Sequence, residues 1–456
     1  MQRSKLCLVL VCVITGISCQ QDQLAGTGIE EALQNAKLAN EGFSRCIAYR
    51  DAWLEYADPG TGLIPRNIDR GIDIWNAQDA AADNYPFMVL TSAILDKEMY
   101  NGLMLDMLHR EKELTSRVNT LPDTWSFSKK YFLNDTINMD QIIFGSSEYI
   151  KDGLLPLMEY LGKTPWTDRM LEMLDDLNNE VDVVTAMQGK FGSAPLDEVN
   201  GELLQVLSRV YWLTGDHKYL EWAYQIGDFY LSEENLPTNQ EYLRLRDHGC
   251  EIISGLCELY VTTSLIDEDK RQEYKTALYR MLDRILEAGR NKHGMFYNAI
   301  NPSTGEVIEE QIADTWGYTL NGYYAVYLID GTERYKNAVL EALENIHHYK
   351  NYPWEGKSAD GYADAIESAL NLYNRIPSDP VADWIDSETK VMWNKQQESG
   401  IIEGWHGDGN FARTTIMYCL WKTQGLTIDP WREDVIFGAI IRDDQLIFVI
   451  QSEKPW

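Results

Sequence analysis

Hydrophobic residues recur at three- and four-residue intervals along most of this chain, the spacing that places them on one face of an α-helix. Leu203, Leu207 and Val210 show it, and similar patterns cover residues 29–57, 81–117, 165–188, 217–232, 269–290, 333–350 and 379–395. The alternation typical of β-strands is clear only near the end, where residues 435–437 and 446–450 flank a polar turn. The pattern therefore predicts an all-α protein that ends in a short β-hairpin.

Short polar motifs that contain glycine open six of the helical segments. They are Gly145-Ser-Ser-Glu148, Asn200-Gly201-Glu202, Asp247-His248-Gly249-Cys-Glu251, Asp314-Thr-Trp316-Gly317-Tyr318, Asp360-Gly361-Tyr362 and Asp408-Gly409-Asn410. Successive glycines in these motifs are 56, 48, 68, 44 and 48 residues apart. Such intervals fit a repeat of helical hairpins of about 50 residues. We expect an (α/α)6 toroid, or an (α/α)7 toroid if the helix at Asp83-Asn84-Tyr85-Pro86 is an additional inner member.

The first residues resemble the export signal of a bacterial lipoprotein. Arg3 and Lys5 precede an apolar run over 6–17, which is too short to span a bilayer, and Ser18-Cys19 follows. Gly16 stands where a lipobox usually has an aliphatic residue, so ordinary secretion stays open as the alternative. We expect a signal peptide over 1–18, lipidation of Cys19, a flexible tether over 19–28 and anchoring in the bacterial envelope.

No Ser/Pro-rich linker or low-complexity tract divides the rest of the chain. We therefore expect one toroid domain over 29–430, with the hairpin over 431–456 packed on it. The formal net charge is −31 over 456 residues, and this excludes the basic surface that nucleic-acid binding needs. The four cysteines beyond the signal lack zinc spacing, so we expect buried free thiols, no metal and no cofactor. They are Cys46, Cys250, Cys257 and Cys419.

Closing the hairpins into a ring would bring the first residues of the inner helices to one mouth. A simple interpretation gives each Asp, Asn or Ser of the motifs an N-cap role and each glycine a packing role. The motifs contain more than capping needs, because carboxylates, histidines and aromatic residues accompany the caps. Converging groups of this kind predict a carbohydrate site at the mouth.

The hairpin repeat, the Asp-Gly motifs and the Gly-aromatic loops resemble those of the (α/α) toroid carbohydrate-active enzymes of bacteria. Gly62-Leu63-Ile64-Pro65 and Gly404-Trp405-His406 are two of these loops. The group includes exo-β-glucuronidases, unsaturated glucuronyl hydrolases and toroid polysaccharide lyases. The Trp-x-Arg-Gly motif associated with the unsaturated glucuronyl hydrolases is absent, which disfavours hydration of an unsaturated uronate. The resemblance implies a monomeric, β-glucuronidase-like glycoside hydrolase that acts on an oligo- or polysaccharide.

Glycoside hydrolysis needs one carboxylic acid that protonates the leaving oxygen and a second carboxylate that activates water or attacks carbon. Asp314 is the first choice for the acid, because the neighbouring Trp316 and Tyr318 would raise its pKa. Glu148 is favoured as its partner, since it lies one turn into its helix and is less needed for capping. Further candidates for catalysis are Asp360, Asp247 and His248.

Aromatic and basic residues near the motifs are candidates for binding the sugar. Trp75, Trp316 and Trp405 are candidate stacking platforms, although most of the 14 tryptophans must belong to the core. Arginines before the presumed mouth segments favour an anionic sugar such as a uronate. The resemblance to the exo-β-glucuronidases implies exo action on a uronate residue. The full set for substrate binding is Arg66, Arg70, Trp75, Asp83, Asn84, Arg246, Trp316, Tyr318, Tyr362, Trp405, His406, Asp408 and Asn410.

Two other classes of function stay open at this point. One is a lyase in which Tyr318, Tyr362 or His248 removes the C5 proton of a uronate. The other is a surface lipoprotein that binds glycans without acting on them. Added water in the product distinguishes hydrolysis from elimination, and the lack of any product distinguishes the binding protein.

Overall fold

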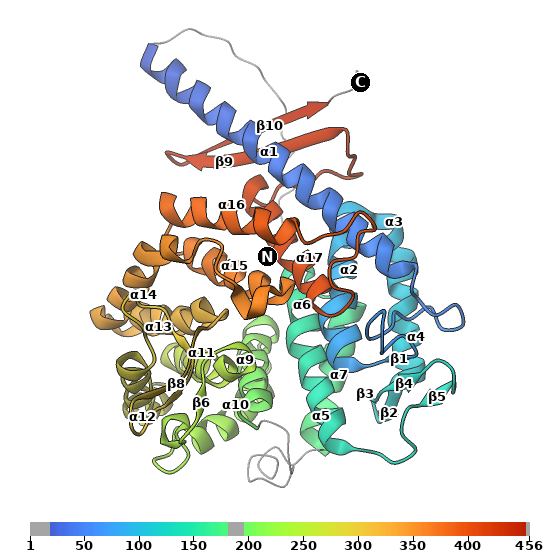
Figure 1. Ribbon diagram of the computed structural model, residues 1–456. Helices are drawn as coiled ribbons and strands as arrows, with labels where there is room; N and C mark the ends of the chain where they lie inside the picture. Colours follow the sequence, from blue (N-terminus) through green and yellow to red (C-terminus); the bar gives the residue numbers. More distant parts are fainter. Residues whose placement is uncertain (1–18, 181–195, 453–456) are drawn as a thin grey trace. The chain divides into compact units, whose positions relative to one another are not determined.

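The computed structural model describes residues 19–180 and 196–452, and the predicted signal peptide lies outside them. The chain forms two compact units. The larger is Gly42–Tyr418, and the smaller combines the residues up to Glu41 with those from Cys419 onward. Figure 1 shows the helices and strands of both units.

The larger unit is built from pairs of antiparallel helices. Its inner helices are η1 (Ala77–Asn84) with α2 (Tyr85–Leu95), α5 (Met139–Glu148) with η3 (Tyr149–Leu154) and α6 (Leu155–Leu161), α9 (Leu196–Thr214), α11 (Glu251–Ile266), α13 (Trp316–Asp330), α15 (Ala359–Tyr373) and α17 (Gly407–Thr423). The outer helices are the part of α1 (Cys19–Leu54) from Gly42 onward, α3 (Lys97–Met99) with η2 (Tyr100–Met104) and α4 (Leu105–Thr115), α7 (Pro165–Glu180), α10 (His217–Tyr230), α12 (Glu268–Ala288), α14 (Glu333–Asn345) and α16 (Asp379–Trp393). The inner helices are buried on most sides, whereas the outer ones bury a single face.

The inner helices form a closed ring. Helix α9 packs against α10 and α11, α11 against α12 and α13, α13 against α14 and α15, and α15 against α16. The ring closes where Gly409 of α17 lies against the backbone of Asp83 in η1. Counted over the described residues, seven inner helices line the ring, so the predicted toroid is confirmed in its seven-hairpin form.

Two motif glycines show why the repeat selects this residue. A Cβ atom at Gly201 would lie 2.2 Å from the Ile252 nitrogen of the neighbouring inner helix. A Cβ atom at Gly409 would lie 1.7 Å from the Asp83 carbonyl oxygen. Only a residue without a side chain allows these helices to approach so closely. The packing interpretation of these two glycines is confirmed.

The helix expected over 81–117 is a hairpin of an inner and an outer helix. Helix α2 ends at Leu95, and the Asp96 side chain accepts a hydrogen bond from the Met99 nitrogen at the start of α3. An aspartate cap can start a new helix in a different direction without glycine or proline. The apolar pattern continues across the turn, which is why it suggested one segment.

Short strands in the loops between hairpins were not expected from the sequence. They form the sheets β6 (Leu243–Arg244), β7 (Tyr297–Asn301) and β8 (Glu306–Ile312); β1 (Ile74–Trp75), β4 (Trp125–Ser126) and β5 (Tyr131–Phe132); and β2 (Ser116–Val118) with β3 (Leu121–Pro122). All of the ladders are antiparallel, with Ile300 paired to Val307 and Leu243 paired to Ile300. Most of these strands are too short to show an alternating pattern. Single helical turns also occur at η4 (Pro237–Asn239), η5 (Asp247–Cys250), η6 (Ile346–Tyr349) and η7 (Trp354–Lys357).

The smaller unit pairs residues 19–41 of α1 with the terminal hairpin. Strands β9 (Val435–Arg442) and β10 (Gln445–Ser452) form a regular antiparallel ladder, which confirms the predicted hairpin. Asp443 and Asp444 have φ values of 50° and 58°, as a two-residue hairpin turn requires. Arg442 pairs with Glu31 at 2.6 Å, and the Asn35 amide donates to the Ala439 carbonyl.

Cys46, Cys250, Cys257 and Cys419 are buried free thiols, as predicted. Among the described residues, the segment Asp247–Ile266 is long and apolar enough to cross a membrane, with a mean hydropathy of 1.2. This segment includes the inner helix α11, and 61% of it is buried inside the protein. The core helix of a globular protein has the same length and composition.

Candidate functional site

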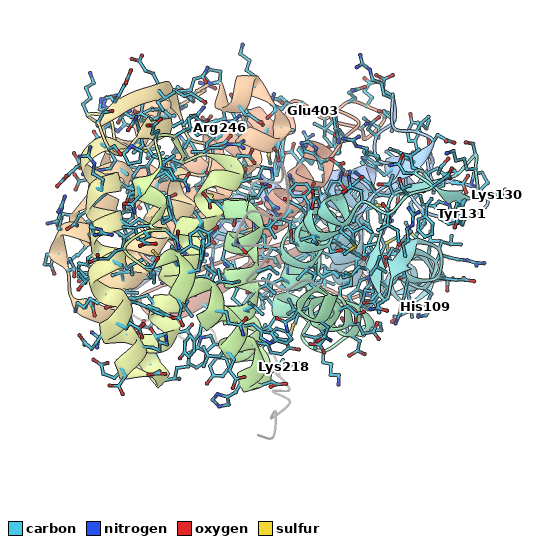
Figure 2. All side chains as sticks on the ribbon, turned by 90° about the horizontal axis from the view of Figure 1, so that it is seen from below. His109, Lys130, Tyr131, Lys218, Arg246 and Glu403 are labelled. Carbon is cyan, nitrogen blue, oxygen red and sulfur yellow. The ribbon has the colours of Figure 1, made fainter. Side chains whose placement is uncertain are left out.

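Polar residues of the inner helices and of the loops before them lie near one face of the larger unit, which we call the mouth. Arg246 precedes α11 and Glu403 precedes α17, and both lie on the same edge in Figure 2. Lys218, in the first turn of the outer helix α10, lies on the opposite edge. Residues that are far apart along the sequence therefore lie at the same face.

Asp314 lies at the mouth just before α13 and is 3% exposed. The Thr315 nitrogen donates to Asp314 Oδ1 at 2.9 Å. Burial raises the pKa of Asp314 to about 7, and the nearby carboxylates of Asp247, Glu355 and Asp360 act in the same direction. The Asp314 carboxyl can therefore hold a proton near neutral pH.

Asp360 lies in the first turn of α15, but it is not the cap of that helix. The Ser358 side chain takes this role by accepting from the Gly361 nitrogen at 2.8 Å. Asp360 Oδ1 instead accepts a hydrogen bond from the Asn410 amide, and its Oδ2 lies 3.9 Å from His406 Nε2. The capping explanation for Asp360 is thus replaced by contacts with two other mouth residues.

A second group of contacts surrounds Asp79, which no motif had suggested. Asp79 accepts from Arg66 Nε at 2.9 Å and from Trp405 Nε1 at 3.0 Å, and it lies 3.5 Å from His406 Nδ1. The Arg66 guanidinium lies 5.1 Å from the centre of the Trp405 ring, and Trp405 is 39% exposed. Trp405 therefore presents an aromatic surface at the mouth that Arg66 and Asp79 hold in place.

Charges in this group change the protonation of its members. Burial opposes the charge on His406, but its hydrogen bond to Asp79 and the carboxylates of Asp360 and Asp83 raise the pKa of His406 to about 10. Burial raises the pKa of Asp83 well above its ordinary value, although His406 opposes the shift. The group thus combines a cationic imidazole with a carboxyl that favours its neutral form.

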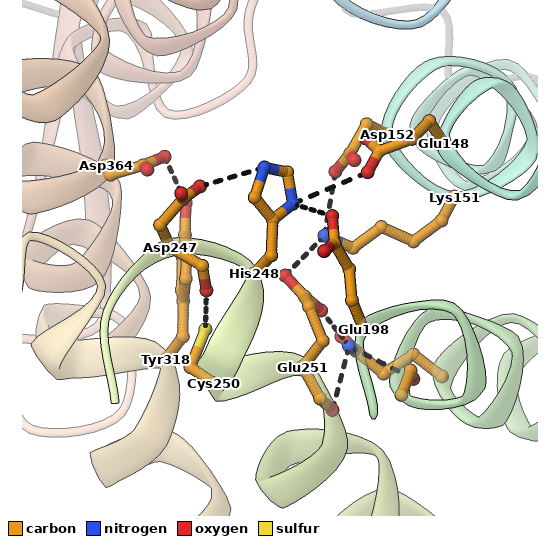
Figure 3. A network of polar contacts seen from close by, with 12 residues as sticks. Glu148, Lys151, Asp152, Glu198, Asp247, His248, Cys250, Glu251, Tyr318 and Asp364 are labelled. Atoms are coloured by element: carbon orange, nitrogen blue, oxygen red, sulfur yellow. Dashed lines mark hydrogen bonds and ion pairs between the residues drawn. The ribbon is translucent and has the colours of Figure 1, made fainter. Parts of the chain in front are cut away.

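His248 is the centre of a third group, shown in Figure 3. Its Nδ1 lies 2.5 Å from Glu198 Oε1 and 3.4 Å from Glu148 Oε1, and its Nε2 lies 3.2 Å from Asp247 Oδ1. Burial opposes the charge, but Glu198 and Asp247 raise the pKa of His248 to about 10. Asp247 also pairs with Arg244 and has a φ of 46°, a conformation that is unusual outside glycine.

Polar side chains continue from the mouth into the ring. The Lys151 ammonium pairs with Asp152 at 2.8 Å and with Glu251 at 2.7 Å. Arg413 pairs with Glu367 at 2.7 Å, and the Tyr318 hydroxyl donates to Glu367 at 2.9 Å. Tyr318 is therefore part of a buried network, where burial raises the pKa of its hydroxyl, and it is a poor base for a lyase.

Several predicted binding residues do not face the mouth. Trp75 and Trp316 are 2% and 0% exposed, so neither presents a ring to a sugar and both platform predictions are wrong. Arg70 is almost fully exposed, and its ion pair is with Asp69 at 3.9 Å. Asp408 is buried, and its carboxylate accepts from the Ile402, Glu403 and Gly404 nitrogens and from Trp53 Nε1. This last set of contacts fixes the loop before α17, which is a structural role.

Asn84 and Tyr362 are also buried. The Tyr49 hydroxyl donates to the Asn84 carbonyl oxygen, and Lys395 lies over the Tyr362 ring. Asp83, Arg246 and Asn410 do lie among the mouth groups, and Arg246 Nη1 is 3.6 Å from Glu355 Oε1. Asp79, Glu198 and Glu202 belong to the site but were missed. Asp79 and Glu198 lie outside the glycine motifs, whereas Glu202 belongs to the Asn200-Gly201-Glu202 motif but was not selected as a site residue.

Two groups of carboxylates and histidines bring ligand atoms within 4.8 Å of one another in the described part of the chain. One contains Asp79, Asp83 and His406, and the other contains Glu148, Glu198, Glu202 and His248. In the first group, Asp79 accepts hydrogen bonds from Trp405 Nε1 and Arg66 Nε. The second has buried carboxylate oxygens that lack donors.

No protein-family model and no curated protein matches the sequence. Solved structures with a similar fold include an α-1,6-mannanase of glycoside hydrolase family 76 from Salegentibacter, with 13% identity and a TM-score of 0.45 over 68% of this chain and 95% of that chain. A family 76 mannosidase from Bacteroides thetaiotaomicron has 12% identity and a TM-score of 0.44 over 83% and 98% of the two chains. Cellobiose 2-epimerase from Bacillus thermoamylovorans has 13% identity and a TM-score of 0.42 over 58% and 84%. These neighbours are toroid carbohydrate-active enzymes, and the likeness concerns the fold alone.

Proposed function

We propose that the protein is a glycoside hydrolase in which Asp314 is the general acid. The observation that carries the proposal is a buried carboxyl at the mouth whose pKa is raised to about 7 by burial and by neighbouring carboxylates. A carboxyl that keeps its proton near neutral pH can protonate the oxygen of a leaving sugar.

We assign Asp360 as the second catalytic carboxylate, which either activates water or attacks the anomeric carbon. It is among the charges that raise the pKa of Asp314, and Asn410 and His406 orient it. Glu148, the partner favoured from the sequence, is not among the charges that act on Asp314, and the charges that act on Glu148 most strongly are Glu202, Asp152 and Glu198. The structure therefore supports Asp360 over Glu148 for this role.

The exposed ring of Trp405 supports a sugar-binding role beside Asp360. Trp405 and His406 are consecutive, so a sugar stacked on the indole lies next to the imidazole that approaches Asp360. Aromatic rings bind the apolar faces of sugars, whereas His406 and Asn410 offer hydrogen bonds to hydroxyl groups.

We extend the proposal to an anionic sugar, cleaved from the end of a glycan. Arg246 pairs with Glu355, whose carboxylate also acts on Asp314, so the guanidinium lies near the proposed acid. The Arg246 side chain is 26% exposed. A guanidinium at this position can pair with the carboxylate of a uronate. Arg66 is engaged by Asp79 and serves to hold Trp405.

We also propose that residues 1–18 are an export signal and that Cys19 is lipidated, so that the glycan-degrading enzyme is anchored in the bacterial envelope. Radioactive palmitate incorporated by the wild type and lost in Cys19→Ser tests this part. If the signal peptide of the wild type is removed but no palmitate is incorporated, the protein is secreted without a lipid anchor.

Incubation with uronate-containing and neutral glycans, followed by mass analysis of the products, tests the activity. We expect a monosaccharide that carries one added water, and we expect Asp314→Asn and Asp360→Asn to lose activity by at least about 100-fold. Products without added water that absorb in the ultraviolet overturn hydrolysis. Activity confined to neutral glycans overturns the uronate assignment and keeps the hydrolase.

A further inference from the structure

Four acidic and imidazole side chains meet at the mouth outside the proposed catalytic pair. Glu148, Glu198, Glu202 and His248 make up this group, here called the Glu-His cluster. Glu148 ends α5, His248 lies in η5, and the other two are one turn apart on α9. Positions i and i+4 share a helix face, so α9 directs both of its carboxylates to the same point.

Glu202 is fully buried, and neither of its carboxylate oxygens has a hydrogen-bond partner among the described residues. Glu148 Oε1 also has no hydrogen-bond donor there. Ionised carboxylates only accept hydrogen bonds, so Glu148 and Glu202 can bond to each other only when one of them keeps a proton. Buried carboxylates that face each other therefore need a positive charge between them, either a shared proton or a cation.

Lys151 is the nearest ammonium group, but other carboxylates hold it. Its Nζ bonds to Asp152 Oδ1 at 2.8 Å and to Glu251 Oε1 at 2.7 Å. The Gln205 amide donates to the second oxygen of Glu251. These contacts leave the oxygens of Glu202 without a direct cationic partner.

His248 has the arrangement of a metal-binding imidazole. Its Nδ1 points into the cluster, toward Glu198 and Glu148, while its Nε2 lies 3.2 Å from Asp247 on the other side (Figure 3). A histidine that binds a metal through one nitrogen commonly donates the other N–H to a carboxylate. Asp247 offers that carboxylate, and Arg244 holds it.

We propose that the Glu-His cluster binds a divalent transition-metal ion of the Zn²⁺ or Mn²⁺ class. An imidazole nitrogen together with carboxylate oxygens suits these ions, whereas Ca²⁺ takes oxygen ligands. The three carboxylates supply the negative charge that compensates a dication. The site goes beyond the proposed hydrolase and does not depend on it, because binding is measured without a substrate.

Calorimetric titration of the EDTA-treated full chain with ZnCl₂, MnCl₂, CaCl₂ and MgCl₂ tests the proposal. The decisive variant is Glu202→Gln, which keeps the shape and removes one charged ligand. The matched control is Asp79→Asn, in the other acidic group at the mouth. We expect the wild type and the control to bind Zn²⁺ or Mn²⁺, and Glu202→Gln to bind at least about 10-fold more weakly.

Thermal unfolding of the metal-free proteins separates binding from folding. Glu202→Gln removes a buried acidic group that has no donor, so its Tm should be at or above that of the wild type without metal. The ion should raise the Tm of the wild type and of Asp79→Asn, and that of Glu202→Gln less. Glu198→Gln replaces this variant if Glu202→Gln does not fold. Equal affinity of the variant, loss of binding in Asp79→Asn alone, or binding of Ca²⁺ alone overturns the proposal. If the folded wild type binds none of the four ions, the proposal is also overturned. A proton on His248 would then supply the positive charge that compensates the carboxylates of the Glu-His cluster.

Discussion

Gly409 of α17 lies against the backbone of Asp83 in η1, where a Cβ atom would come within 1.7 Å of the Asp83 carbonyl oxygen. This contact closes the ring of inner helices. It also brings His406, three residues before Gly409, to the group that contains Asp79 and Asp83. Closure of the fold and assembly of the site thus depend on the same close approach.

The first prediction is that Gly409→Ala strongly destabilises the larger unit. The added methyl group has to displace backbone rather than the end of a flexible side chain, so we expect a loss of about 3 kcal/mol or more in the free energy of unfolding. Urea unfolding followed by circular dichroism measures it. Gly102→Ala is the control, since nothing lies within 4 Å of a Cβ atom there. A loss of less than about 1 kcal/mol in Gly409→Ala would show that the helices separate easily.

The second prediction concerns the pH dependence of stability through Asp314. Burial raises the pKa of Asp314 to about 7 in the folded protein, above its ordinary value of 3.8. The folded state therefore binds the proton more tightly, and this contribution to stability is lost as the pH rises from about 4 through about 7. Asp314→Asn removes the loss, so its Tm should exceed that of the wild type at about pH 8.5 by more than at about pH 5.

The same protonation predicts the activity profile. If Asp314 is the general acid, activity falls as the pH rises above about 7, because the carboxyl then loses its proton. A Tm difference that is constant with pH would contradict the raised pKa, whatever the activity. A profile that does not fall above pH 7, together with the expected Tm behaviour, would remove Asp314 from the acid role.

Much of this architecture could be predicted from the sequence, because glycine, helical periodicity and capping residues act locally. The spacing of Gly201 and Gly409 revealed the repeat, and the structure shows that both are contact points between inner helices. The groups at the mouth were harder to predict, since Asp79 and Glu198 lie outside the glycine motifs. Trp75 and Trp316 failed as platforms because a tryptophan next to a polar motif packs inward as readily as it faces a ligand.

The third prediction is that Trp405→Ala weakens substrate binding. Loss of the stacking surface should raise KM by about 3- to 10-fold and change kcat less, whereas Trp405→Phe should retain most of the affinity. Steady-state kinetics on the cleaved glycan measure both values. Trp212→Ala is the matched control, because Trp212 is 51% exposed near the end of α9, away from the mouth. Equal KM values in Trp405→Ala and the wild type would exclude stacking on this ring.

The fourth prediction concerns a buried ion pair between two outer helices. Arg169 of α7 donates to both carboxylate oxygens of Glu111 in α4, at 2.9 and 2.6 Å, and its third nitrogen donates to the Thr120 carbonyl oxygen. The side chains of the pair are 1% and 3% exposed. Arg169→Met leaves the Glu111 carboxylate buried without its cation, so we expect a loss of about 3–5 kcal/mol in the free energy of unfolding.

Chemical denaturation of the single and double variants checks this prediction. Arg169→Met combined with Glu111→Leu should recover part of the loss, because the double variant buries no uncompensated charge. Arg110→Ala is the control, since the pair of Arg110 with Glu113 is 54% and 64% exposed and should contribute less than about 1 kcal/mol. Strictly additive losses in the double variant would mean that Arg169 stabilises the hairpins by packing and by its bond to Thr120, and that its charge contributes little.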